Sequence, residues 1–134
     1  MQIQTFFTLY AISFPLFLLC DMLWLGFIAK GFYRAQVGHL MGDIVWVAAL
    51  LFYALFLLGL TFFATYPAAT KGTIATAILL GGLFGFFTYA TYDLTNLATL
   101  KSWPLQLSIV DIMWGTFLGA FVSGTAVYIH SLFV

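Results

Sequence analysis

The sequence predicts an all-α, polytopic membrane protein whose four transmembrane helices form an antiparallel bundle in a single domain, residues 1–134. The first observation is composition: 64% of the residues are hydrophobic and 6% are charged, whereas a soluble domain carries charge on about a quarter of its residues. The second is that the chain divides into apolar runs, each long enough for a hydrocarbon core that needs about 20 residues per helix. The third is that these runs lack the alternating polar residues of barrel strands, so helices must satisfy the backbone in lipid.

Four apolar runs are predicted as membrane spans, and together they use almost the whole chain. They cover residues 6–28, 44–66, 73–100 and 104–133. Residues 1–5 contain no Lys or Arg, and the first run exceeds the apolar region of a signal peptide, so we expect this helix to be retained. Because the connections are short, neighbouring helices in sequence are expected to be antiparallel.

Positive charges are divided unevenly between the two ends of the predicted bundle. The first and third connections carry Lys30, Arg34 and Lys101, while the second carries Lys71 alone. The positive-inside bias therefore predicts that the first and third connections are cytoplasmic and that both termini lie outside. The first connection also mixes apolar with basic residues, which is typical of a segment lying in the membrane interface.

All four acidic residues are aspartates, and none of them lies in a long polar loop. Asp21 and Asp93 each precede a lysine at a helix end by eight or nine residues, which is about 12–14 Å along a helix. Asp111 lies about 10 Å into the fourth helix by the same rise, so the three acids share one membrane half. Asp43 opens the second helix on that side.

An ionisable group in the hydrocarbon core costs about 3 kcal/mol or more, so a shared polar pocket is favoured over solitary acids that face lipid. The alternative is structural. Each carboxyl is then protonated or hydrogen-bonded between helices, and it contributes only packing contacts worth about 0.6–2 kcal/mol per bond.

Each aspartate is followed at position i+3 by a side chain with an N–H donor. Residues i and i+3 share a helix face, so the donor can bond the carboxyl of its own helix, or both groups can point into one cavity. Tyr89 falls on the stripe of Asp93 and Asn96. The candidate ligand-pocket residues are therefore Asp21, Trp24, Tyr89, Asp93, Asn96, Asp111 and Trp114, with Asp43 and Trp46 as secondary candidates.

Small residues mark the helix faces that are expected to pack closely. They recur at steps of four, as Gly115, Gly119 and Ser123 in the fourth run and as Gly81 and Gly85 in the third. Such stripes let two helix backbones approach each other in a membrane. Because Asp111 begins the stripe of the fourth run, its carboxyl is expected to face protein rather than lipid.

Local similarity also raises the hypothesis of an internal duplication. Segments 43–46 and 111–114 read Asp-Ile-Val-Trp and Asp-Ile-Met-Trp, and Asp21 and Asp93 precede their lysines at similar distances. The first two helices would then repeat as the last two. A parallel two-plus-two repeat of this kind tends to place substrate or ion sites at the repeat interface.

The run Tyr92-Asp93-Leu94-Thr95-Asn96-Leu97-Ala98-Thr99, together with Cys20-Asp21 and Asp111-Ile112-Met113-Trp114, resembles a family of small bacterial four-helix membrane proteins described only as a domain of unknown function. The likeness extends over nearly the whole chain. It implies a multi-pass protein of the bacterial inner membrane, so that the outside termini would be periplasmic. It also implies a loose association with lipid modification, but no agreed activity, cofactor or catalytic residue.

These observations predict an integral membrane protein with an acidic intramembrane pocket in the cytoplasmic half. It would bind, or help to modify, a lipid-like or small polar ligand, because polar residues confined to one membrane half favour a pocket open to one side. One alternative is a proton or cation pathway through the same acids. The other is a non-catalytic accessory subunit of a larger membrane complex, and a homo-oligomer is also open.

The chemistry available to the acids is limited to acid–base work or oxygen ligation. With Asn96 they offer the ligand type that Mg²⁺ or Ca²⁺ takes, but the chain contains no metal motif and no set of nucleophile, base and orienting group. Whether the protein is an enzyme, and with which cofactor, is left open by the sequence. Nucleic-acid binding is disfavoured by a net charge of +0 and the lack of a basic patch.

The charge bias predicts the outcome of a labelling experiment. In a Cys20→Ala background, an impermeant maleimide added to intact cells should label Thr70→Cys, because the second connection is expected outside, and should spare Ala35→Cys. Both substitutions leave every charged residue in place. Labelling of Ala35→Cys but not of Thr70→Cys would reverse the predicted orientation.

Overall fold

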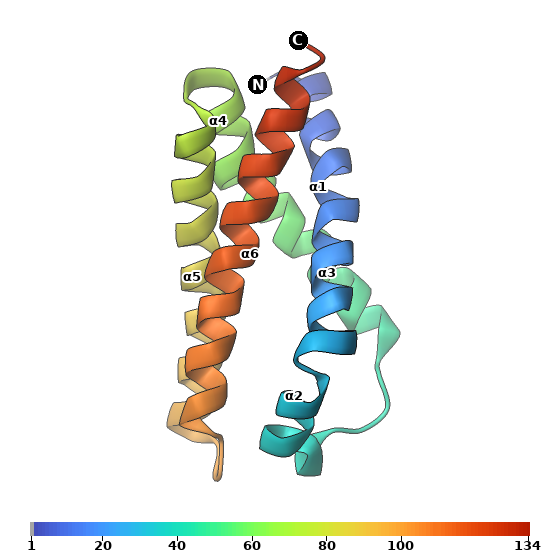
Figure 1. Cartoon of the computed structure of the whole chain (residues 1–134), viewed down its shortest axis with the longest axis vertical. Helices are drawn as coiled ribbons and strands as arrows, with labels where there is room; N and C mark the ends of the chain where they lie inside the picture. The colour runs from blue at the N-terminus through green and yellow to red at the C-terminus, as the bar shows by residue number, and fades with distance from the viewer. Residues whose placement is uncertain (1) are drawn as a thin grey trace.

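The structure is a computed structural model that describes residues 2–134. Four helices are long and apolar enough to cross a membrane, and they cover Ile3–Ile28, Trp46–Lys71, Ile74–Thr99 and Leu105–Ser131. The helices run up and down in sequence order, so both termini lie at one end of the bundle (Figure 1). The predicted four-helix membrane fold is therefore confirmed.

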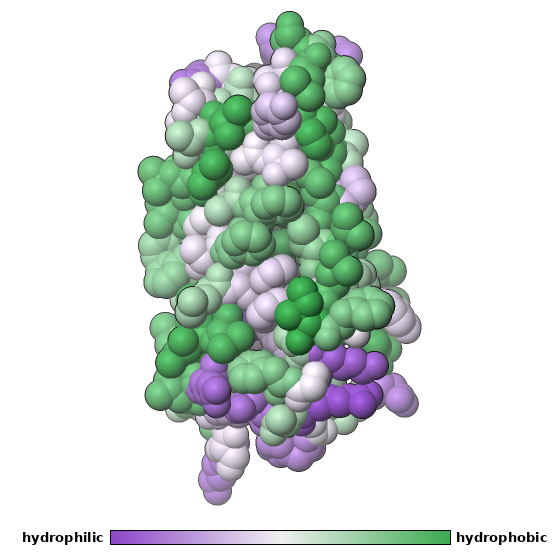
Figure 2. All heavy atoms as spheres, in the orientation of Figure 1, coloured by the Kyte–Doolittle hydropathy of each residue, from purple (hydrophilic) through white to green (hydrophobic). Residues whose placement is uncertain are grey.

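The first span bends into a short helix at the end of the bundle opposite the termini (Figure 1). Its elements are α1 (Ile3–Leu23), the π turn η1 (Trp24–Ile28), α2 (Lys30–Val37) and the 3-10 turn η2 (Gly38–Leu40). Lys30 and Arg34 are exposed on α2, whereas Tyr33 is half-buried. Hydrophilic side chains gather at this end, while apolar ones cover most of the bundle above it (Figure 2).

The second span continues further than the sequence predicts. Its elements are α3 (Trp46–Leu60), the π turn η3 (Thr61–Thr65) and α4 (Tyr66–Lys71). The expected end at residue 66, just before Pro67, is therefore wrong by five residues. Pro67 falls in the first turn of α4, directly after the π turn, and the helical span continues through it to Lys71.

The last two helices form a tight hairpin. α5 (Ile74–Thr99) begins with a capping box in which the Thr76 N–H donates to Thr73 Oγ1 at 3.2 Å, and α6 (Leu105–Ser131) follows a short connection. The stripes of small residues meet at this interface. A Cβ atom on Gly85 would overlap the Gly115 carbonyl, and one on Gly119 would overlap the Gly81 carbonyl. Glycine is therefore required for this approach.

An apolar core fills the middle of the bundle. It consists of seven buried residues from α1, α3, η3 and α6, namely Phe17, Phe56, Leu57, Leu60, Ala64, Leu118 and Val122. Below this core, α3 slants away from α5 towards the α2 end (Figure 1). The two helix pairs thus pack differently, and the internal duplication stays a prediction.

We predict that alanine is tolerated at one glycine of α5 and not at another. Gly82→Ala should be neutral or stabilising, because the new Cβ would lie 3.4 Å from the nearest atom, an ordinary van der Waals contact. Alanine is also the better helix former by about 0.8–1 kcal/mol. Gly85→Ala should lower the thermal midpoint in detergent, because the obstructing atoms belong to the backbone of Gly115 and overpacking costs about 1–3 kcal/mol. Equal midpoints for the two variants would contradict the close approach.

Candidate functional site

A hollow of about 360 Å³ lies between the apolar core and the α2 end of the bundle. All five helices of this half contribute to its wall. The lining residues are Asp21 and Leu25 from the first span, Tyr33 from α2, Ala49, Phe52 and Tyr53 from α3, Thr88, Tyr89 and Tyr92 from α5, and Asp111 and Trp114 from α6. Two aspartates predicted for the pocket therefore reach one cavity.

Asp21 is held by donors from two other helices. It lies one turn after the core residue Phe17 and is 4% exposed. The Tyr53 hydroxyl of α3 donates to Asp21 Oδ2 at 2.7 Å, and the Trp114 indole of α6 donates to Oδ1 at 3.4 Å. The carboxyl thereby links α1 to both α3 and α6.

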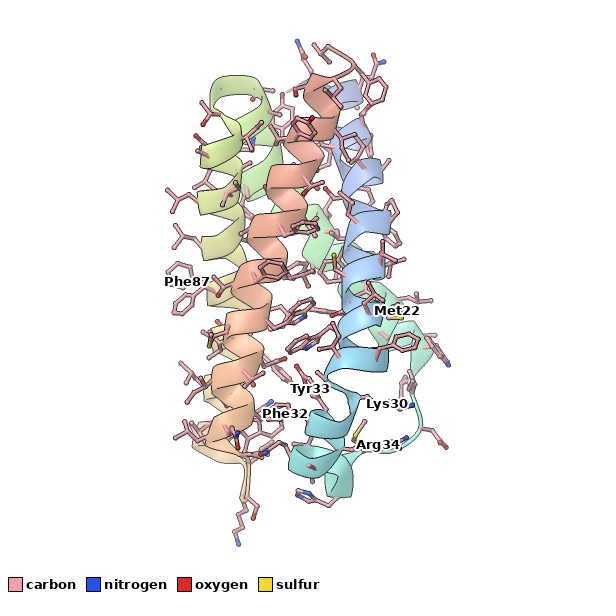
Figure 3. The ribbon with its side chains drawn as sticks, in the orientation of Figure 1. Met22, Lys30, Phe32, Tyr33, Arg34 and Phe87 are labelled. Atoms are coloured by element: carbon pink, nitrogen blue, oxygen red, sulfur yellow. The ribbon has the colours of Figure 1, made fainter. Side chains whose placement is uncertain are left out.

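Asp111 receives its donor from the short helix α2. The Tyr33 hydroxyl donates to Asp111 Oδ1, and the Trp24 indole donates to the Tyr33 oxygen at 3.2 Å. Burial raises the pKa of the Tyr33 phenol, and the hydrogen bond to Asp111 raises it further, so Tyr33 remains a donor at neutral pH. In Figure 3 Tyr33 extends from α2 towards α6, on the side away from Lys30 and Arg34.

The two core tryptophans join these groups into one network. Trp24 and Trp114 stack with ring centroids 4.4 Å apart and an angle of 6° between the ring planes. Trp114 donates to Asp21 on another span and Trp24 donates to Tyr33 on the adjoining α2, so neither indole bonds the carboxyl three residues before it. Of the two arrangements considered for these i+3 pairs, a bond within one helix is therefore not formed by Trp24 or Trp114.

Asp93 lies outside the hollow, in the interface between α5 and α6. It is 0% exposed, and neither of its carboxylate oxygens receives a hydrogen bond from residues 2–134. Its carboxyl is a direct neighbour of the Asp111 carboxyl, while its backbone oxygen accepts a bond from Ser108 Oγ at 3.5 Å. A buried carboxyl without a donor is rare in proteins, so this group needs a proton or a ligand atom.

The other predicted residues take different places. Tyr89 lines the hollow and lies against the backbone of Gly115. Asn96 is half-buried beside the Tyr92 phenol, outside the lining. Asp43 is exposed in the segment before α3, and Trp46 is 64% exposed as the first residue of that helix. The structure does not bring these last three residues to the hollow.

Sequence reasoning missed the two tyrosines that hold the carboxyls. Tyr53 follows the start of α3 by seven residues, about 10 Å along the helix. Comparing the depth of the tyrosines with that of the aspartates would therefore have identified it. Tyr33 lies in the connection that was expected at the interface. Its role depends on the way α2 folds back beneath the bundle, and the sequence carries no periodic signal for that.

The acidic residues of the site do not form a metal site of the usual composition. Among residues 2–134, no group of three His, Cys, Asp or Glu side chains could hold a metal ion. Asn96, the proposed additional oxygen ligand, lies outside the hollow lining. The hollow instead offers carboxylate acceptors surrounded by aromatic rings.

The hollow is partly open, and both α3 and α5 contribute residues to its wall. α5 packs against the second span at the π turn η3, while α3 diverges from it below (Figure 1). Among the lining residues, Phe52 of α3 is 48% exposed and Tyr92 of α5 is 58% exposed. Both helices belong to spans that are long and apolar enough to cross a membrane, so these exposed rings lie on a surface that would meet lipid.

Comparison with known proteins gives one match. The model of a family described as "Predicted membrane protein (DUF2177)" matches residues 6–128, which confirms the resemblance noted in the sequence. No curated protein and no solved structure matches the chain. The chain belongs to the DUF2177 family of predicted membrane proteins.

Proposed function

We propose that this membrane protein binds the polar end of a lipid-like or small polar ligand in the hollow between α3 and α5. The observation that carries the proposal is the convergence of Asp21 and Asp111 in one partly open cavity between candidate membrane spans. Two carboxyls in such a place are costly, and a ligand that donates hydrogen bonds to them or neutralises their charge would offset that cost.

The size and lining of the hollow support ligand binding. Its volume of about 360 Å³ falls within the range of about 300–1,000 Å³ found for small-molecule sites. Six of its eleven lining residues are aromatic, and such sites combine apolar walls with a few convergent polar groups. The open side of the hollow would let an acyl chain stay in the bilayer while the polar end enters.

The apolar core argues against the proton or cation pathway. Phe17, Leu57 and Leu118 are each 0% exposed and lie between the hollow and the end of the bundle that carries the termini. A continuous water path through the bundle would have to cross this packed layer. A site open to one side fits the arrangement better.

The proposed site belongs to the cytoplasmic half of a bacterial inner membrane. Lys30, Arg34 and Lys101 lie at the α2 end, whereas Lys71 lies at the end with the termini. The positive-inside bias then assigns the hollow to the cytoplasmic leaflet and the termini to the periplasm.

Filling the hollow should displace the ligand. Thr88→Phe adds a ring at the lining, whereas Thr91→Phe adds the same ring at an exposed position of α5. Both hydroxyls bond a carbonyl four residues earlier, at 2.8 Å for Thr88 and 2.6 Å for Thr91, so the pair is matched. After incubation with equimolar phosphatidylethanolamine and phosphatidylglycerol, native mass spectrometry should show a several-fold loss of bound lipid for Thr88→Phe only.

Two results would contradict the proposal. Equal lipid retention by both variants would show that the retained lipid lies elsewhere on the surface. Wild-type protein that retains no lipid, and that gains no thermal stability from the mixture, would remove the lipid-like ligand altogether.

Replacement of the aspartates by leucine should separate their roles in folding. Asp21→Leu should lower the thermal midpoint, because it leaves the Tyr53 hydroxyl and the Trp114 indole without their acceptor, at about 1–3 kcal/mol per buried group. Asp93→Leu should be neutral or stabilising, because it removes a carboxyl that receives no bond from the described residues.

The corresponding Asn variants provide the control for this series. Asp21→Asn keeps an oxygen acceptor and should recover most of the loss. If Asp93→Leu lowers the thermal midpoint as much as Asp21→Leu does, Asp93 is an interhelical hydrogen-bonding residue and is not available to a ligand.

A further inference from the structure

We infer that the ligand of the hollow carries an ammonium group, either as a lipid headgroup or as a free amine. This inference rests on the proposed function and names the chemistry of its ligand. It is carried by three features of the site, namely the sign of its charged groups, the ring faces around them and the acceptor capacity that the protein leaves unused.

The charged groups of the hollow are all acidic. Asp21 and Asp111 line it, Asp93 adjoins Asp111, and none of the described lining residues is Lys, Arg or His. Lys30 and Arg34 belong to α2 but extend on the side away from Tyr33 (Figure 3). A phosphate or carboxylate ligand would therefore meet only like charge, whereas a cation would neutralise a carboxylate in a medium of low dielectric constant.

The aromatic residues suit a cation as well. Rings from α3, α5 and α6 line the hollow, namely Phe52, Tyr53, Tyr89, Tyr92 and Trp114. The negative face of an aromatic ring attracts an ammonium group, most strongly when water is excluded, and rings grouped as a cage recognise quaternary ammonium ligands. Purely apolar ligands would leave the carboxylates unmatched.

The protein's own donors do not saturate the carboxylates. Asp111 Oδ1 accepts from Tyr33, and Asp21 Oδ1 has only the long bond of 3.4 Å from Trp114. A carboxylate has about four acceptor sites on its two oxygens. Asp93, which adjoins Asp111, likewise receives no hydrogen bond from residues 2–134.

The test compares a charged probe with a neutral one of the same shape. Binding of choline to the protein in a non-ionic detergent is followed by saturation-transfer NMR, with 3,3-dimethylbutan-1-ol as the uncharged isostere and inorganic phosphate as the anion. We expect choline to bind, tetramethylammonium to compete with it, and neither the isostere nor phosphate to compete at tenfold higher concentration. Competition by the isostere equal to that of tetramethylammonium would overturn the ammonium assignment.

Matched variants tie the binding to the hollow. Asp111→Asn retains an acceptor for Tyr33 but loses the charge, and it should weaken choline binding at least tenfold. Asp43→Asn, at an exposed aspartate outside the hollow, should leave it unchanged. Trp114→Leu should likewise weaken binding, in contrast to Trp46→Leu. Equal behaviour within either pair would place choline outside the hollow and contradict the inference.

The lipid experiment distinguishes a lipid headgroup from a free amine as the source of the ammonium group. It also separates failure of the ammonium inference from failure of the proposed ligand site. Preferential retention of phosphatidylethanolamine over phosphatidylglycerol, lost in Thr88→Phe, supports a lipid headgroup. Choline binding that is lost in Thr88→Phe without any lipid preference supports a free amine. Equal retention of both lipids, lost in Thr88→Phe and combined with no choline binding, would overturn the ammonium inference while the proposed site survives.

Discussion

The α2 half of this bundle depends on the cost of placing carboxyl groups among apolar helices without a cation beside them. Asp21 and Asp111 meet that cost through hydroxyl and indole donors from neighbouring elements. Tyr33 consequently fixes α2 beneath the bundle, and Tyr53 fixes α3 against α1. Removing an acceptor would leave its buried donors unpaired, which is why these bonds constrain the helices more strongly than their modest net energies indicate.

The other structural element of the site is rigid for a different reason. α5 and α6 approach so closely that a Cβ on Gly85 would overlap backbone atoms, and in a membrane such contact through small residues replaces hydrophobic burial as the source of association. This hairpin forms a fixed wall for the hollow. α3 diverges from this hairpin towards the α2 end (Figure 1), and residues of α3, α5 and α6 together line the hollow.

The spans could be predicted because hydropathy over about 20 residues reports directly on the thickness of the hydrocarbon core. Counting residues from helix ends likewise placed Asp21 and Asp111 at a common depth. The prediction failed where one helix cannot specify its neighbour. Spacing indicated that Trp114 shares a face with Asp111, but its partner Asp21 lies on another helix. The predicted end of the second span at residue 66 was also too early, because the helix continues through the π turn η3 and α4 to Lys71.

The π turn η1 explains how Tyr33 reaches the site at all. In this turn the Ala29 N–H donates to the Trp24 oxygen at 2.7 Å, five residues back instead of four. One additional residue in a turn rotates everything that follows by about 100° relative to a regular helix. Without it, α2 would present a different side chain towards Asp111, and the carboxyl would lose its donor. Single π turns occur frequently at functional sites, and here the turn connects Asp21 and Trp24 of the first span to the phenol that completes the network.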